Sequence, residues 1–167
     1  LLINSNGMTL GGTLSSGTAS TTIQASRADT TIGLGTGAGT FSLTTAKLNQ
    51  ITAGSLIVGD NTNGTITVGG LTTISTPLTL NATKAGSAVN FDTGLSSGLG
   101  DLTINAGTGG VGFVVDVSTT GNMNVISGGA ITDTGALTVG GTSSFTTNVA
   151  NQAITLDNTS NVFTGAV

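Results

Sequence analysis

Short triplets of apolar, polar and apolar residues recur along the chain, and this repeat constrains the fold more than any other feature. The last residues of one set of triplets are separated by 24, 24, 22, 24 and 21 positions: Leu10, Leu34, Val58, Leu80, Ile104 and Val125. A second set falls between them with steps of 20, 25, 23, 22, 24 and 19: Ile23, Leu43, Val68, Phe91, Phe113, Leu137 and Leu156. Two interleaved series that share one period indicate a repeat architecture.

The triplets alternate with the period of two that is typical of a β-strand. Clusters of Gly, Asn, Ser and Thr separate them, as turns would. A coil of this length cannot bury its own apolar side chains, but coils stacked at about 4.8 Å bury them together. The repeat therefore predicts an all-β parallel β-helix (β-solenoid) with about 22 residues per coil and roughly seven coils. We expect ladders of apolar, Thr and Asn side chains inside it, and the five Phe residues in its core.

Residues 1–167 are expected to form a single β-solenoid segment. The chain begins without an initiator Met or a basic signal-peptide region and ends in what resembles a strand. We therefore expect an internal fragment of a much longer repeat protein.

Two alternatives compete with this prediction, one for the whole fold and one for a single segment. An antiparallel sandwich is favoured by Asn63-Gly64, a strong hairpin signal, but it does not account for the long period. The best helical candidate is residues 41–51 (FSLTTAKLNQI). Its Thr pair and the glycines that flank it argue against a helix there.

The chain carries unusually little charge. Only 6% of its residues are charged, against about 25% in typical domains, and the net charge is −4 with three basic residues. We expect no nucleic-acid partner, because phosphate binding needs a basic surface. No run of about 18 apolar residues is present, so we expect no membrane insertion. A hydrophobic content of 37% favours order over disorder, and the absence of Cys excludes disulfides.

One glycine-rich stretch matches a cofactor motif. Gly33, Gly35 and Ala38 fit the G-x-G-x-x-A dinucleotide fingerprint. That fingerprint needs a helix to follow, because the pyrophosphate binds at the helix N-terminus, and the sequence that follows here is β-like. We interpret the glycines as a corner between residues 32–34 on one face of a coil and residues 41–43 on the next face.

Three further stretches resemble binding motifs and are interpreted as turns. DNTNGT (60–65) lacks the third-position and closing ligands of a calcium loop. GGVGFVVD (109–116) resembles a calcium-binding β-roll repeat but is not repeated in tandem. RAD (27–29) resembles an integrin-binding tripeptide with Ala in place of Gly.

Catalysis would have to depend on very few residues, because the chain has no Glu, His, Cys or Tyr. Glycoside hydrolysis usually needs two carboxylates. Asp92 and Asp116 lie 24 residues apart, as do Asp133 and Asp157, so each pair could stack on neighbouring coils. We interpret them as solvated turn residues. We predict no enzyme, no catalytic, cofactor-binding or metal-binding residue, and no cofactor.

Two alternative functions remain open. One is a carbohydrate-active β-helix that uses the Asp pairs. The other is an ice-binding or surface-binding β-solenoid, for which Thr65 and Thr67 have the right alternation, although the same pattern does not recur at the coil period.

Nearly half of the chain resembles a known family. The first signature is I-T-A-G-x-L-x-V/I-G, then a Gly/Asn turn and I-T-V, within residues 41–74. The second is G-A-L-T-V-x-G-x-x-x-F followed by I-T-L-x-N, within residues 128–167. Both resemble the repeats of filamentous-haemagglutinin-type (two-partner secretion) adhesin exoproteins and are similar to autotransporter passenger β-helices. The resemblance implies a right-handed parallel β-helix that serves as an adhesin shaft exported to the bacterial cell surface. The family's Asn-rich secretion motifs are not evident, which implies an internal shaft segment.

We therefore expect a structural shaft segment of a large secreted bacterial surface adhesin or extracellular filament. A host or cell-surface receptor or glycan would bind regions outside this segment. The low charge favours lateral or head-to-tail self-association of shafts. The expected location is extracellular, at the bacterial cell surface.

Overall fold

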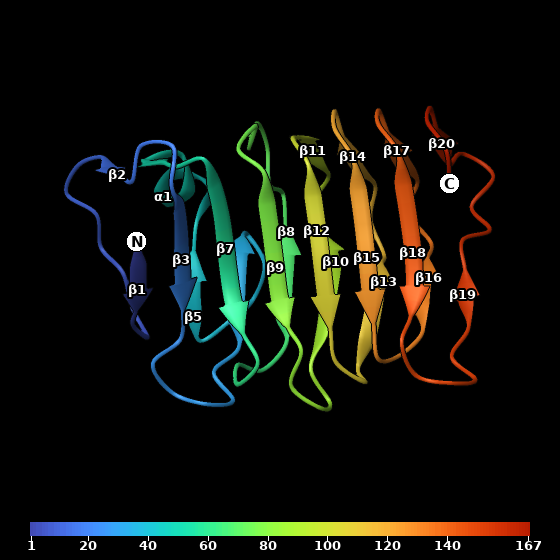
Figure 1. The fold of residues 1–167 in the computed structure, drawn as a ribbon, viewed down its shortest axis with the longest axis horizontal. Helices are drawn as coiled ribbons and strands as arrows, with labels where there is room; N and C mark the ends of the chain where they lie inside the picture. Colours follow the sequence, from blue (N-terminus) through green and yellow to red (C-terminus); the bar gives the residue numbers. More distant parts are fainter.

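The computed structural model describes residues 1–167, which form a rod of stacked coils with the two termini toward opposite ends (Figure 1). All pairs of strands are parallel. The fold is thus a β-solenoid of about seven turns whose strands stack about 22 residues apart. This confirms the predicted parallel β-helix, and the antiparallel sandwich is wrong.

The first sheet runs the length of the rod in the order β1-β3-β7-β9-β12-β15-β18. Its strands are Leu2–Asn4, Ser20–Gln24, Ser55–Asp60, Leu78–Ala82, Leu102–Ala106, Met123–Ser127 and Ser143–Thr147. From β3 to β15, alternate residues of each strand point inward and are buried. Val58, Leu80, Ile104 and Val125 stand in register and are 0% exposed, as the spacing predicts.

The second sheet lies opposite the first in the order β19-β16-β13-β10-β8-β4-β5. Its strands are Ile154–Thr155, Ile131–Asp133, Gly110–Phe113, Ala88–Thr93, Ile66–Gly69, Ile32–Gly35 and Phe41–Leu43. Val68, Phe91 and Phe113 stack in register inside it. The rings of Phe91 and Phe113 are stacked with their centroids 5.3 Å apart.

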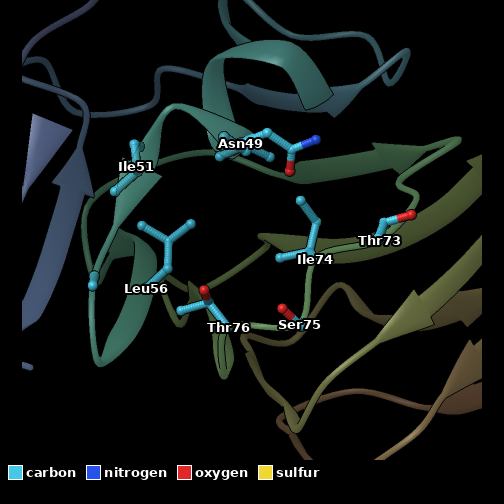
Figure 2. Close-up of a pocket in the computed structure, with 9 residues that line it drawn as sticks. Asn49, Ile51, Leu56, Thr73, Ile74, Ser75 and Thr76 are labelled. Carbon is cyan, nitrogen blue, oxygen red and sulfur yellow. The ribbon is translucent and has the colours of Figure 1, made fainter. Parts of the chain in front are cut away.

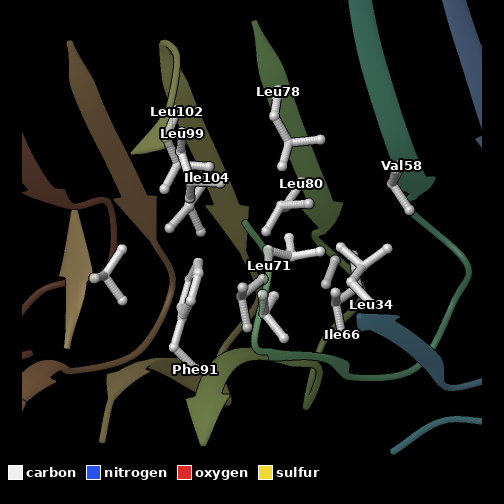
Figure 3. Packing of buried hydrophobic residues seen from close by; sticks show 14 of the residues in the cluster. Leu34, Val58, Ile66, Leu71, Leu78, Leu80, Phe91, Leu99, Leu102 and Ile104 are labelled. Atoms are coloured by element: carbon white, nitrogen blue, oxygen red, sulfur yellow. The ribbon is translucent and has the colours of Figure 1, made fainter. Parts of the chain in front are cut away.

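The third face is divided between two short sheets. One has the order β11-β14-β17-β20, with strands Ser96–Leu99, Val117–Thr119, Leu137–Val139 and Val162–Phe163. The other pairs β2 (Leu14–Ser15) with β6 (Ile51–Thr52). The three faces enclose one core of 31 buried residues, part of which Figure 3 shows, so no coil has a core of its own.

The Phe residues occupy this core, as expected. Phe41, Phe91 and Phe113 are fully buried. Phe145 and Phe163 are partly buried and pack against the core. Their rings form an edge-to-face pair with centroids 5.9 Å apart.

The predicted series of apolar residues are wrong in the first coils and at the end of the second series, where Asp133 pairs with Phe113 and Leu137 lies on the third face. Ile23 lies in the first sheet, where it pairs with Val58, whereas Leu34 lies in the second sheet and pairs with Val68. Leu10 lies outside any strand. The cause is an insertion, because one coil runs 35 residues from Thr22 to its partner Ile57. The steps within the two predicted series stay between 19 and 25 residues, so they do not reveal this long coil.

The insertion begins at the glycine-rich stretch, where the chain steps back by one layer. Strand β5 pairs with β4 in the same sheet, with Ile32 opposite Phe41, so the prediction of a corner leading to the next face is wrong. The connecting residues 36–40 fold back over β4. A Cβ atom on Gly33 would overlap the carbonyl oxygen of Gly37, and one on Gly39 would overlap the amide nitrogen of Gly33. The glycines are needed because two backbones approach this closely.

The insertion continues into the only helix, α1 (Thr45–Asn49), where the sequence argued against one. Thr44 is its N-cap, and its Oγ1 accepts a hydrogen bond from the Lys47 amide at 3.3 Å. Leu48 anchors the helix on the core. The Thr pair that seemed unfavourable therefore starts the helix, since Thr is a preferred N-cap residue.

Thr and Asn ladders exist, but they lie on the outer face and not inside. Thr79 pairs with Thr103 and Asn81 with Asn105 on adjacent strands β9 and β12. The Asn105 side-chain amide donates to the Asn81 oxygen at 2.7 Å. Thr21, Asn63 and Thr119 are buried singly, and each has a hydrogen-bond partner, because a buried polar side chain without one is costly.

Candidate functional site

The outer face of the first sheet is the most regular surface of the molecule. One row of residues in register crosses it, and every member is uncharged: Thr22, Ile57, Thr79, Thr103, Asn124 and Ser144. Most of these side chains are half-buried by their neighbours. The face therefore offers hydroxyl and amide groups at the spacing of the strands, without charge.

Asp133 is the one carboxylate built into the interior. It is 6% exposed and continues the column of Phe113 in the second sheet. Its oxygens accept hydrogen bonds from the amide of Asp157 at 3.1 Å, the amide of Asn158 at 3.4 Å and the side chain of Asn161 at 2.6 Å. Asp133 and Asp157 thus do lie on neighbouring coils, as their spacing suggested. The interpretation of Asp133 as a solvated turn residue is wrong, because the carboxylate anchors the last loop.

Asp92 and Asp116 are not in register. Because Phe91 pairs with Phe113, the register places Asp92 opposite Val114 and not opposite Asp116. Asp116 accepts a hydrogen bond from the amide of Ala136 on the following coil, at 2.8 Å. Neither predicted pair therefore presents two free carboxylates to one substrate.

Two of the motifs that resemble ligand loops, DNTNGT and RAD, form turns in the structure. The interpretation of GGVGFVVD (109–116) as a turn is wrong, because Gly110–Phe113 form strand β13. In DNTNGT, Asp60 Oδ1 accepts hydrogen bonds from the amides of Thr62 at 2.7 Å and Asn63 at 3.0 Å. This closes the turn between β7 and β8. Asp29 of RAD lies in an exposed turn and forms an ion pair with Lys84. No group of three or more Asp side chains gathers in the structure, and the five-residue helix α1 is too short to cross a bilayer.

A groove opens on the third face where the insertion ends (Figure 2). Its volume is about 190 Å³. The residues that line it are all uncharged: Leu48, Asn49, Ile51, Ala53, Leu56, Thr73, Ile74, Ser75 and Thr76. Sequence reasoning missed this groove. The available signal was residues 41–51, which add apolar residues that the period does not require.

The comparisons with known proteins concern the C-terminal coils. Residues 100–167 match a family described as repeats of unknown function (DUF5649). The matched segment contains strands β12 to β20. Comparison with curated proteins and with solved structures gives no match. The family match agrees with the repeat architecture and assigns no activity.

Proposed function

We propose that the chain is a non-catalytic shaft segment of a large secreted bacterial surface adhesin or extracellular filament. The observation that carries this proposal is the continuous register of the first sheet. Its strands follow one another from β1 to β18 with no missing partner. Every coil is therefore hydrogen-bonded to the next along the axis of the rod, which is what a rigid spacer requires.

The turns add a second set of axial bonds. The amide of Asn122 donates to Asp101 Oδ1 at 2.7 Å, and the amide of Thr142 donates to Asn122 Oδ1 at 2.8 Å. Each side chain thereby fastens the turn of the following coil. Turns held in this way expose little free backbone, which suits a protein that meets extracellular proteases.

Placement at the cell surface is supported by the resemblance of residues 41–74 and 128–167 to two-partner secretion exoproteins. In this proposal the receptor or glycan binds outside the segment. The uncharged outer face of the first sheet suits lateral contact between shafts, because no like charges oppose it.

An epitope tag tests the surface location. Inserted after Gly86, where no heavy atom lies within 4 Å of an added Cβ, the tag should leave the coils intact. In the bacterium that encodes the protein, we expect antibody to label intact cells. Labelling that appears only after lysis would contradict the proposal, and a tagged cytoplasmic protein serves as the control for leakage.

A second candidate is ice or crystal-surface binding. It is favoured by Thr79 and Asn81 on one coil and Thr103 and Asn105 on the next, which repeat in register. Thermal hysteresis of the purified protein would support this candidate. The carbohydrate-active alternative is tested by a glycan-cleavage screen, in which loss of a measured activity in Asp116→Asn would overturn the non-catalytic proposal.

A further inference from the structure

Asn-Gly is the dipeptide at which asparagine most readily loses its side-chain amide, and the chain contains two of them. They are Asn6-Gly7 in the first coil and Asn63-Gly64, the hairpin signal. In this reaction the backbone nitrogen of the glycine attacks the asparagine Cγ. Glycine favours the attack because it has no Cβ to obstruct the approach. Since both dipeptides share this chemistry, a difference in their reactivity has to come from the fold.

The fold holds every atom that Asn63 would use. Asn63 is 0% exposed. Its Oδ1 accepts a hydrogen bond from the Asp60 amide at 2.5 Å, and its Nδ2 donates to the Gly64 carbonyl at 2.6 Å. The Gly64 amide donates to the Thr30 carbonyl at 3.0 Å. The attacking nitrogen and the leaving amide are therefore both fixed, and the side chain is closed to water.

Asn6 is held at one atom only. Its Oδ1 accepts hydrogen bonds from the amides of Ser26 at 3.0 Å and Arg27 at 3.3 Å, and no hydrogen bond holds its Nδ2. The Gly7 amide donates to the Ser5 hydroxyl, two residues earlier, at 3.2 Å. Gly7 is exposed, and a Cβ atom on it would meet nothing within 4 Å. The attacking nitrogen and the leaving amide are therefore accessible.

The two amides that hold Asn6 Oδ1 also suit the reaction. When the Gly7 nitrogen adds to Cγ, negative charge develops on Oδ1, and N–H groups directed at a developing oxyanion stabilise it. The Cγ–Nδ2 bond then breaks, and the proton of the Gly7 amide passes through water to the departing ammonia, which leaves a succinimide ring. Water opens that ring to aspartate or isoaspartate.

We propose that Asn6 is a site of spontaneous deamidation, whereas the fold protects Asn63. The reaction replaces a neutral amide by a carboxylate and adds one negative charge to the first coil. In the aspartate product the carboxylate remains the acceptor for the amides of Ser26 and Arg27. Hydrogen bonds to an ionised acceptor are stronger, so the modification fastens residues 5–7 to the neighbouring coil. This inference does not depend on the shaft proposal.

Incubation of the folded chain at neutral pH, followed by fragmentation mass spectrometry, measures both sites in one sample. We expect Asn6 to be converted about tenfold faster than Asn63 or more, which corresponds to a barrier difference of at least about 1.4 kcal/mol. In urea the fold is lost, and the two sites should be converted at similar rates because glycine follows both.

Two variants identify the mechanism and its consequence. Gly7→Ala adds a Cβ in open space, so the coils stay intact, but it obstructs the attack and should slow conversion of Asn6 by about tenfold or more. Asn6→Asp supplies the product. Its Ser26 and Arg27 amides should exchange with solvent more slowly than in the unmodified chain, because they then donate to a carboxylate.

Three results would overturn the proposal. They are equal conversion of Asn6 and Asn63 in the folded chain, an Asn6 that stays intact while the urea-unfolded chain is converted, and undiminished conversion in Gly7→Ala. Faster exchange of the Ser26 and Arg27 amides in Asn6→Asp would contradict the fastening of residues 5–7. The first two comparisons use the unchanged chain, so they decide the proposal whether or not a variant folds.

Discussion

Replacing Phe113 by Ala should remove a large part of the stability of the rod. The side chain is 0% exposed, and its ring stacks on that of Phe91 at 5.3 Å. Truncation of a fully buried Phe costs about 3–5 kcal/mol of unfolding free energy, from lost transfer energy and the cavity that remains. That is a large share of the roughly 5–15 kcal/mol that stabilises a typical domain.

The stacked pair permits a sharper measurement. A double-mutant cycle of Phe91→Ala and Phe113→Ala should give an interaction of about 0.5–1.5 kcal/mol beyond the area that each ring buries. Phe163→Ala is the matched control, because Phe163 is also paired with a Phe but is only partly buried, on the last coil. We expect that variant to lose less than about 2 kcal/mol.

Urea unfolding followed by far-UV circular dichroism is the suitable assay, because the chain has neither Trp nor Tyr to report by fluorescence. An unchanged denaturant slope in Phe113→Ala would show that the coils still unfold together. A smaller slope would show that the rod had divided into separately unfolding parts. If Phe113→Ala and Phe163→Ala lost equal free energy, the interior column would not be what holds the coils together.

Three further substitutions test other parts of the structure in the same assay. Gly33→Ala should lower the free energy of unfolding by about 2 kcal/mol, because its Cβ would overlap the backbone of residues 37–39. The control Gly7→Ala, in open space, should stay within about 0.5 kcal/mol of the unchanged chain. Equal losses in the two variants would contradict the close approach of the backbones. Asp133→Ala should cost about 1–3 kcal/mol, because it removes a buried acceptor and leaves the partly buried donors of Asn158 and Asn161 without a partner. Hydrogen exchange at Asn158 should accelerate, and unaltered exchange would show that Asp133 does not hold that loop. Lys84→Ala removes the chain's only ion pair, with Asp29, which is exposed. The free energy of unfolding should fall by less than about 1 kcal/mol. A larger fall, or a strong dependence of the unfolding free energy on salt, would show that the ion pair has more than a minor role.

The regular coils could be predicted from sequence because their alternation is strict. Leu80, Ile104 and Val125 each end an apolar, polar, apolar triplet, and all three occupy one buried column. Period and alternation together determine which residues point inward. The first coils could not be predicted in this way. Leu34 and Leu43 fall at acceptable steps by coincidence, although they lie side by side in one sheet.

The candidate sites were harder to predict because they depend on tertiary contacts. The sequence shows that Asp133 is one period from Asp157, but not that its carboxylate enters the interior. It shows glycines at positions 33, 37 and 39. It does not show that residues 36–40 fold back over β4, because close approach of two backbones leaves no trace in alternation or period.

The same insertion produces the largest error in the sequence prediction, and it ends at the groove on the third face. A coil that kept the repeat would continue from Gly35 directly into a third-face strand. The chain instead uses residues 36–50 to step back, form β5 and α1, and enter β6 from a different layer. A solenoid that served only as a spacer would gain nothing from such a departure, since regular coils pair every strand edge. The departure from the repeat is therefore where a binding role, in addition to a structural one, should be sought.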